Sequence, residues 1–260
     1  MLRLGLVQLS VTEGETGENM RRIKALAEKY AAEDIDLLCF PELCLSGYDF
    51  AEAEASKEEE SFFSGLAKEC GIPVLAGIKT EHEGKCYDAA CIWDETGKLL
   101  GEYKKIHLWD KETEFFTGGD ELFVIPFKKW KIGLLICADL RFFEVSTPLK
   151  NMGADILIYP SAWACGYLEL FHLCGRMRSA ENRVYTVLLN RASGDVKYCG
   201  GTAAIGPDGG ILCALPDDRE GFLKVQINKA QIVKARESLA WESMKLPRVY
   251  EQYEQYRFAK

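Results

Sequence analysis

The feature that most constrains the fold is a short apolar segment that ends in a cysteine. Residues 131–137 read KIGLLIC, and polar and charged residues follow at once, up to Glu144. The segment is too short to span a membrane, and its composition is typical of a strand covered on both faces. A strand that ends at Cys137 presents the thiol at the carboxyl edge of a sheet, where ligands bind in open α/β proteins. Cys137 is therefore a candidate nucleophile, with a plain core cysteine as the alternative.

Composition restricts the classes of protein to which the chain can belong. Its 260 residues are 48% hydrophobic, enough for a sizeable core. The net charge of -8 and the lack of a dense Lys/Arg cluster argue against a nucleic-acid partner. No signal-peptide pattern and no apolar run of about 18 residues are present, so we expect a cytoplasmic protein without a membrane partner. The ten cysteines include no C-x-x-C pair, which predicts reduced thiols with neither disulfides nor a zinc site.

Hydrophobic periodicity predicts helices that alternate with strands. The expected strands are residues 2–9, 35–40, 72–79, 87–94, 99–105, 123–127, 131–137, 154–159, 184–190, 202–205, 211–215 and 222–227. The expected helices end near residues 33 and 70, cover 144–152 and 168–182, and start again at 229. This order predicts an α/β protein with a mixed sheet, or two sheets, and helices outside. No linker divides the chain, so we expect one domain over residues 1–260, in which the aromatic tail at 229–260 contacts a second subunit.

Two other reactive residues also follow predicted strands directly. Glu42 comes just after the strand that Pro41 ends, and Lys105 closes the strand at 99–105. If these strands share one direction and are neighbours, a carboxylate, an ammonium and a thiol meet at one rim. Glu42 would then be the general base and acid, and Lys105 would stabilise an oxyanion. The backbone N–H of Ala138 is a second candidate oxyanion donor beside Cys137.

Three blocks of sequence resemble the signature blocks of the nitrilase superfamily, the carbon-nitrogen hydrolases. They are FPELCLSGY at residues 40–48, YKKIHL at 103–108 and LICADLRF at 135–142. The likeness continues in PSAW at 160–163, RMRSAEN at 176–182 and GTAAIGPDGG at 201–210. It covers residue 2 to about residue 250, with the blocks in the family order.

The resemblance implies a Glu-Lys-Cys triad of Glu42, Lys105 and Cys137. It also implies a further active-site glutamate, which we place at Glu112 with Glu114 as the alternative. The implied fold is a four-layer α-β-β-α sandwich, and the implied assembly is a homodimer or larger homo-oligomer formed through helices. The family uses neither a metal nor an organic cofactor, so we expect none here.

Two departures from the family pattern concern the wall beside the nucleophile. Ala138 stands where many relatives have tyrosine, and Phe143 stands where many have proline. Both replacements change the expected pocket. Tyr48 and Trp163 are candidates for its lining, although large aromatic residues also serve as ordinary packing.

Arg141 has two interpretations. Its guanidinium can hold a substrate carboxylate, or it can pair with Asp139, Glu144 or Glu181. Without further information we favour the ion pair.

We therefore expect an amidase-type hydrolase that forms a thioester on Cys137 and releases ammonia or an amine. A short amide, such as the ω-amide of a keto acid or amino acid, is favoured over an N-carbamoyl compound or a nitrile. One alternative is a cysteine-histidine protease or acyltransferase that uses His107 or His172. The other is a thiol protein without catalytic activity.

Overall fold

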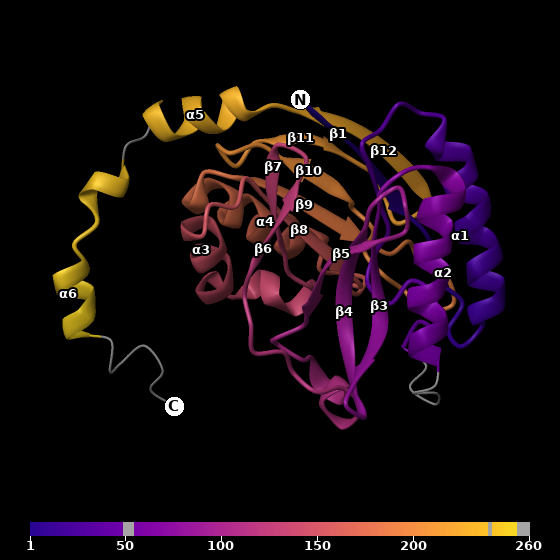
Figure 1. Ribbon diagram of the computed structural model, residues 1–260. Coiled ribbons are helices and arrows are strands. Elements are labelled where there is room, and N and C mark those ends of the chain that lie inside the picture. The colour runs from indigo at the N-terminus through magenta and orange to yellow at the C-terminus, as the bar shows by residue number, and fades with distance from the viewer. Residues whose placement is uncertain (49–54, 239–240, 254–260) are drawn as a thin grey trace.

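Two six-stranded sheets lie face to face in the computed structural model, which describes residues 1–48, 55–238 and 241–253 (Figure 1). In spatial order, the first sheet contains β12 (Gly221–Ile227), β1 (Leu2–Gln8), β2 (Leu37–Cys39), β3 (Val74–His82), β4 (Lys85–Trp93) and β5 (Leu99–Lys104). The second contains β11 (Ile211–Ala214), β10 (Ala203–Ile205), β9 (Tyr185–Asn190), β8 (Ile156–Ser161), β7 (Trp130–Leu134) and β6 (Val124–Phe127). The central strands β1, β2 and β3, and likewise β7, β8 and β9, pair in parallel.

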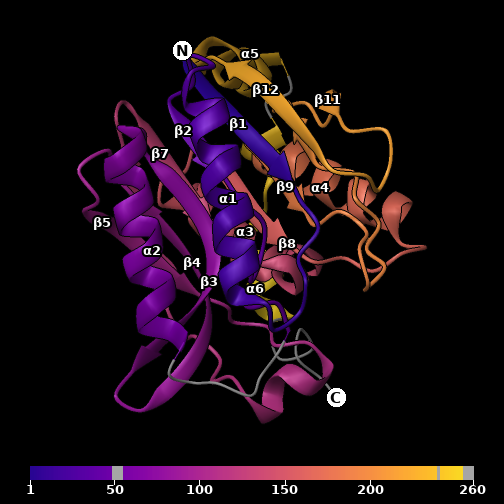
Figure 2. The ribbon, with the colours of Figure 1, turned by 90° about the vertical axis from the view of Figure 1, so that its right-hand side faces the viewer.

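Helices cover the outer face of each sheet. The first sheet is covered by α1 (Thr16–Ala31) and α2 (Ala55–Cys70), and the second by α3 (Phe143–Asn151) and α4 (Leu168–Asn182) (Figures 1 and 2). The predicted four-layer α-β-β-α sandwich is therefore confirmed. None of the described helices is both long and apolar enough to cross a membrane.

The central strands of each sheet are buried on both faces, and the buried apolar side chains form two clusters. Side chains of both sheets meet between them, for example Leu4 and Ile132, while Phe40 and Phe63 belong to the cluster between the first sheet and its helices. Each fully buried Leu, Ile or Phe side chain contributes about 1.5–3 kcal/mol. A strand covered on both faces needs apolar residues at successive positions, which explains the uninterrupted run before Cys137.

The strand that leads to Cys137 ends earlier than predicted. β7 stops at Leu134, and a short 3₁₀ helix occupies Cys137–Arg141. Between them, the Ile136 N–H donates to the carboxylate of Asp139 at 2.9 Å instead of to a neighbouring strand. This side-chain acceptor ends the ladder and turns the chain, so Cys137 lies on a tight turn beyond the sheet edge.

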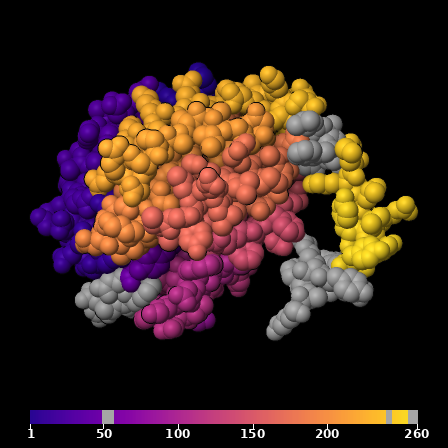
Figure 3. All heavy atoms as spheres, turned by 180° about the vertical axis from the view of Figure 1, so that it is seen from behind, coloured from indigo at the N-terminus to yellow at the C-terminus, as the bar shows by residue number. Residues whose placement is uncertain are grey.

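The C-terminal segment packs on the sandwich through its first helix and then extends away from it. It contains α5 (Lys229–Ser238), a 3₁₀ helix at Trp241–Met244 and α6 (Pro247–Gln252), and α6 stands apart from the body in Figure 3. Leu246, Tyr250 and Tyr253 are more than half exposed. Tyr256 and Phe258, two of the aromatic residues behind the predicted subunit contact, lie outside the described residues. That contact and the assignment of one domain stay predictions.

Candidate active site

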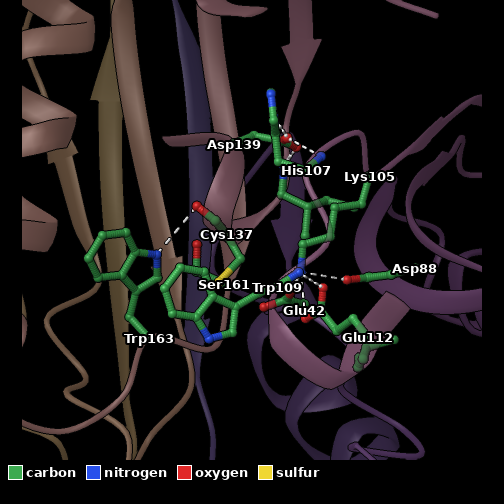
Figure 4. A network of polar contacts seen from close by, with 12 residues as sticks. Glu42, Asp88, Lys105, His107, Trp109, Glu112, Cys137, Asp139, Ser161 and Trp163 are labelled. Atoms are coloured by element: carbon green, nitrogen blue, oxygen red, sulfur yellow. Dashed lines mark hydrogen bonds and ion pairs between the residues drawn. The ribbon is translucent and has the colours of Figure 1, made fainter. Parts of the chain in front are cut away.

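Strand direction brings the three predicted catalytic residues to one end of the sandwich. Glu42 follows β2 and Lys105 follows β5. These two strands run in the same direction, because β2 is parallel to β3 and two successive antiparallel pairings, through β4, connect β3 to β5. Cys137 follows β7 of the opposite sheet. Figure 4 shows the three side chains converging from the two sheets.

Lys105 is the centre of a buried charge cluster. Its Nζ lies 2.6 Å from Glu42 Oε1, 2.8 Å from Glu112 Oε1 and 3.1 Å from Asp88 Oδ2. Burial opposes the positive charge, but Glu42 and Asp88 outweigh it and raise the pKa of Lys105 well above its usual value. The ammonium is therefore charged in the resting protein.

Of the two candidate glutamates, Glu112 is the one that contacts Lys105. Glu112 is buried within a 3₁₀ helix (Asp110–Glu114) and contacts Lys105, whereas Glu114 is exposed. The second carboxylate oxygen of Glu112 accepts the Trp109 N–H at 2.8 Å. Two donors thus fix its orientation, so Glu112 can hold Lys105 in place.

The backbone of Glu42 is fixed by two residues distant in sequence. The buried Arg191 donates from Nε to the carbonyl of Glu42 at 2.8 Å and from Nη2 to the carbonyl of Leu43 at 2.6 Å. Leu43 has a φ of 44°, a left-handed backbone conformation that residues other than glycine rarely adopt, and the Arg191 contact helps to hold it there. On the other side, a Cβ on Gly77 would lie 2.5 Å from Glu42 Cα, so only glycine permits this approach.

Asp139 anchors the turn that bears Cys137. Its carboxylate accepts from the hydroxyl of Tyr103 at 2.8 Å and from the backbone N–H of Ile136 at 2.9 Å, and it lies 2.7 Å from His107 Nδ1. Cys137 itself has a φ of 41°. The turn therefore presents the sulfur in a conformation that its surroundings impose.

Neither histidine of the cysteine-histidine alternative is paired with the thiol. His107 bonds Asp139 and stacks on Phe142 with ring centroids 3.8 Å apart, while His172 Nε2 lies 2.7 Å from the carbonyl of Gly201. Each ring is thus committed to a structural contact.

The Cys137 thiol is protonated in the resting site. Burial is the largest cause, and with the charge of Glu42 it raises the pKa of Cys137 well above its usual value, although Lys105 and the backbone of Ala162 act in the opposite direction. For Glu42, burial favours protonation, but Lys105 and the hydrogen bonds of the cluster outweigh it and lower the pKa. The arrangement thus pairs a protonated thiol with an ionised base.

A pocket of about 400 Å³ opens beside Cys137. Its lining includes the predicted residues Tyr48, Ala138 and Trp163 together with Glu112, and the lining residues that were not predicted are Trp109, Ala162, Ala164 and Tyr167. Phe143 does not line this pocket; it is exposed at the start of α3, so the expected effect of that departure on the pocket wall is wrong.

The expected ion pair of Arg141 is also wrong. Among the described residues, Arg141 makes no ion pair, and the carboxylate of Asp139 is taken by Tyr103 and His107. The guanidinium instead stacks against two rings, with its carbon 4.0 Å from the Trp163 centroid and 4.9 Å from that of Trp109. It lines the pocket, and its buried Nε has no hydrogen-bond partner.

The acidic cluster also has the spacing of a metal site. Carboxylate oxygens of Glu42, Asp88 and Glu112 lie within 4.8 Å of one another. The Lys105 ammonium contacts all three, so the cluster already has a cation. We assign no metal ligands here.

Sequence reasoning missed Asp88, Asp139, Arg191 and Trp109. For Asp88 a signal was present, because one acidic residue interrupts the otherwise apolar run at 87–93, and a charge within a buried strand needs a partner. Arg191 likewise follows directly after β9, a strand whose residues are all buried. The partners themselves come from distant elements and leave no local pattern.

Comparisons with known proteins agree with this geometry. The family model of carbon-nitrogen hydrolases matches residues 3–237. The chain belongs to the carbon-nitrogen hydrolase family. Within it, the (R)-stereoselective amidase of a Pseudomonas species is 30% identical over 221 residues, which cover 81% of this chain and 80% of the relative. The omega-amidase NIT2 of Xenopus tropicalis is 29% identical and covers 91% of this chain and 92% of its own.

A solved structure confirms the architecture of this carbon-nitrogen hydrolase. The Helicobacter pylori G27 carbon-nitrogen hydrolase superposes with a TM-score of 0.88 and covers 96% of this chain and 97% of its own, at 22% identity. At that identity the match supports the fold alone. Family membership and the amidase relatives make the chain a hydrolase of the nitrilase superfamily.

Proposed function

We propose that this hydrolase cleaves the carbon-nitrogen bond of a small amide through a thioester on Cys137. The observation that supports this most is the buried contact of the Lys105 ammonium with Glu42 and Glu112 beside a pocket that Cys137 and Glu112 line. A base, a fixed cation and a nucleophile meet where a small carbonyl compound fits. These are the groups that acyl transfer needs.

The proposed reaction has two halves. Glu42 takes the thiol proton as Sγ attacks the amide carbon, and the oxygen that becomes negative is stabilised by the Lys105 ammonium. The N–H of Ala138 adds a second donor, because it lies in the first turn of a 3₁₀ helix, where no intrahelical acceptor is available. The carbon-nitrogen bond then breaks as Glu42 returns the proton to the leaving nitrogen. In the second half Glu42 deprotonates a water that attacks the thioester carbon. The carbon-sulfur bond then breaks, the carboxylic acid leaves, and Glu42 returns the proton to the sulfur of Cys137.

Arg141 supports an amide whose far end bears a carboxylate. Five N–H donors in a planar arrangement match a carboxylate, and the two tryptophans hold that plane by stacking. A buried donor without an acceptor is costly, so the site gains by binding one. The ω-amide of a short dicarboxylic acid, including a keto acid or amino acid, satisfies both ends of the pocket.

Ammonia release from a panel of small amides, N-carbamoyl compounds and nitriles tests both parts. We expect release from carboxylate-bearing amides by the wild-type protein and none by Cys137→Ala. Wild-type-like release by Cys137→Ala would refute the thioester mechanism. Release from N-carbamoyl compounds or nitriles alone would mean that the same triad acts on another class of substrate.

The role of Arg141 needs a matched pair of substrates. For Arg141→Gln we expect kcat/KM on the carboxylate-bearing amide to fall about 10- to 100-fold, the loss expected for a charge-assisted hydrogen bond. The corresponding neutral amide should lose little. An equal loss on both substrates would show that Arg141 supports the pocket rather than selecting the substrate.

We also propose that the chain self-associates through its C-terminal segment. Leu246, Tyr250 and Tyr253 are exposed on a segment that leaves the sandwich, and a partner surface would bury them. Sedimentation of the full chain should give a dimer or larger species, and substitution of all three by serine should give a smaller one. Sedimentation of the full chain as a monomer would refute this.

A further inference from the structure

Asp88 reaches the same ammonium as the predicted triad but has no assigned role. It lies in β4, and its carbonyl accepts the backbone N–H of Lys105 at 2.9 Å, so strand pairing places the two residues side by side. Its side chain is fully buried, and Oδ2 is 3.1 Å from Lys105 Nζ (Figure 4). The position of Asp88 is therefore as firmly fixed as that of Glu42.

In the described structure, Asp88 and Glu42 have buried carboxylate oxygens that accept no hydrogen bond. Apart from the ion-pair contact with Lys105, neither Asp88 oxygen accepts a hydrogen bond, and neither does Glu42 Oε2. All three oxygens are buried, and oxygens of the two carboxylates lie within 4.8 Å of each other. Two buried carboxylates at this range repel, whereas one proton between them removes the repulsion and provides a hydrogen bond.

Glu112 is the wrong place for that proton. Both of its oxygens already accept, one from Lys105 Nζ and the other from the Trp109 N–H, each at 2.8 Å. A proton on Glu112 would displace one of these donors. The excess negative charge of three carboxylates around one ammonium is therefore relieved between Glu42 and Asp88.

The groups around the cluster do not supply a second positive charge to balance the three carboxylates. Arg191, which directly follows β9, lies near Glu42, but its Nη1 is paired with Glu13 Oε1 at 3.0 Å. Lys79, directly opposite Asp88 on β3, has Glu59 near it as a counter-charge. The remaining titratable neighbours are Tyr48 and Cys137, and burial raises the pKa of each well above its usual value, so both are neutral.

We propose that Asp88 is a positioning residue that holds one proton in the resting site and donates it in a hydrogen bond to Glu42. The bond keeps Glu42 ionised and oriented to receive the thiol proton of Cys137, so this role rests on the proposed function of Glu42. The pKa directions of these two groups agree with this: burial raises the pKa of Asp88 well above its usual value, and the pKa of Glu42 is lowered. Burial raises the pKa of Glu112 too, but both of its oxygens already accept hydrogen bonds, so the geometry favours Asp88.

Infrared spectroscopy of the resting protein tests the proton directly, without substrate or turnover. At alkaline pH we expect the carbonyl band of a protonated carboxylic acid, lost in Asp88→Asn. Glu59→Gln is the control, because burial raises the pKa of Glu59 to about 7 and this group is ionised at alkaline pH. The control should keep the band. A wild-type spectrum without the band, or a band that survives in Asp88→Asn, overturns the proposal whether or not the protein is an amidase.

The acid limb of the kcat/KM profile gives a second test, using the substrate found in the ammonia assay. Asparagine keeps a neutral donor, so Asp88→Asn should leave the limb near its wild-type pH. Asp88→Ala removes the donor and should move the limb up by about one to two pH units. A shift to lower pH in both variants would mean that Asp88 is ionised in the wild type and would overturn the proposal. Thermal unfolding identifies folded variants, and the spectrum of Asp88→Asn decides if Asp88→Ala does not fold.

Discussion

Replacement of Lys105 by methionine tests the charge cluster most directly, because it removes the cation and keeps most of the volume. Three buried carboxylates within 3.1 Å of Nζ would lose their common partner. Loss of one member of a buried ion pair costs about 3–5 kcal/mol. We expect the free energy of unfolding to fall by about that amount at about pH 8.

The loss should depend on pH in a definite direction. Without the cation, the pKa of Glu42 in the folded protein rises above its unfolded value, and the pKa of Glu112, which burial already raises, rises further, so the folded state binds more protons than the unfolded state. Stability then decreases as pH rises through the raised pKa values. At about pH 5, protons replace part of the missing charge, so we expect roughly half of the loss or less.

Urea unfolding followed by tryptophan fluorescence measures both values. Lys104→Met is the matched control, because the neighbouring ammonium is half-buried and lies 4.2 Å from the Tyr87 ring centroid without joining the cluster. It should cost about 1 kcal/mol or less, equally at both pH values. Equal losses for the two variants, or a Lys105→Met loss that does not change with pH, would refute the charge argument.

Two further outcomes follow from the same geometry. Glu112→Gln should lower kcat about 100-fold or more, because a neutral amide holds the ammonium less well, whereas Glu114→Gln should leave kcat within about twofold of the wild type. Steady-state kinetics of the two variants would contradict the assignment if Glu114→Gln were the one with the large loss. Gly77→Ala should lower the free energy of unfolding by about 1–3 kcal/mol and lower kcat, because its Cβ would lie 2.5 Å from Glu42 Cα. Gly65→Ala in α2, whose Cβ would meet no atom within 4 Å, should leave stability unchanged or raise it. A Gly77→Ala protein as stable and active as Gly65→Ala would contradict the close approach.

The resemblance to the family predicted the fold well because its layers depend on short-range patterns. Apolar runs such as KIGLLIC require burial on both faces, and amphipathic segments such as α1 require one buried face. The ends of elements were less predictable, as β7 shows, because the side chain of Asp139 competes for a backbone N–H only once the turn exists.

The sequence by itself determined the reactive residue types, their order along the chain and the strands that precede them, because these depend on residues that are neighbours in the chain. Only the tertiary structure decided their partners. Glu112 rather than Glu114 meets Lys105, Asp88 joins the cluster, Arg141 stacks between two tryptophans instead of forming an ion pair, and Arg191 holds the Glu42 loop from 149 positions away. Such contacts depend on where two sheets bring distant segments together, and burial then makes each unpaired charge or donor costly enough to select one arrangement.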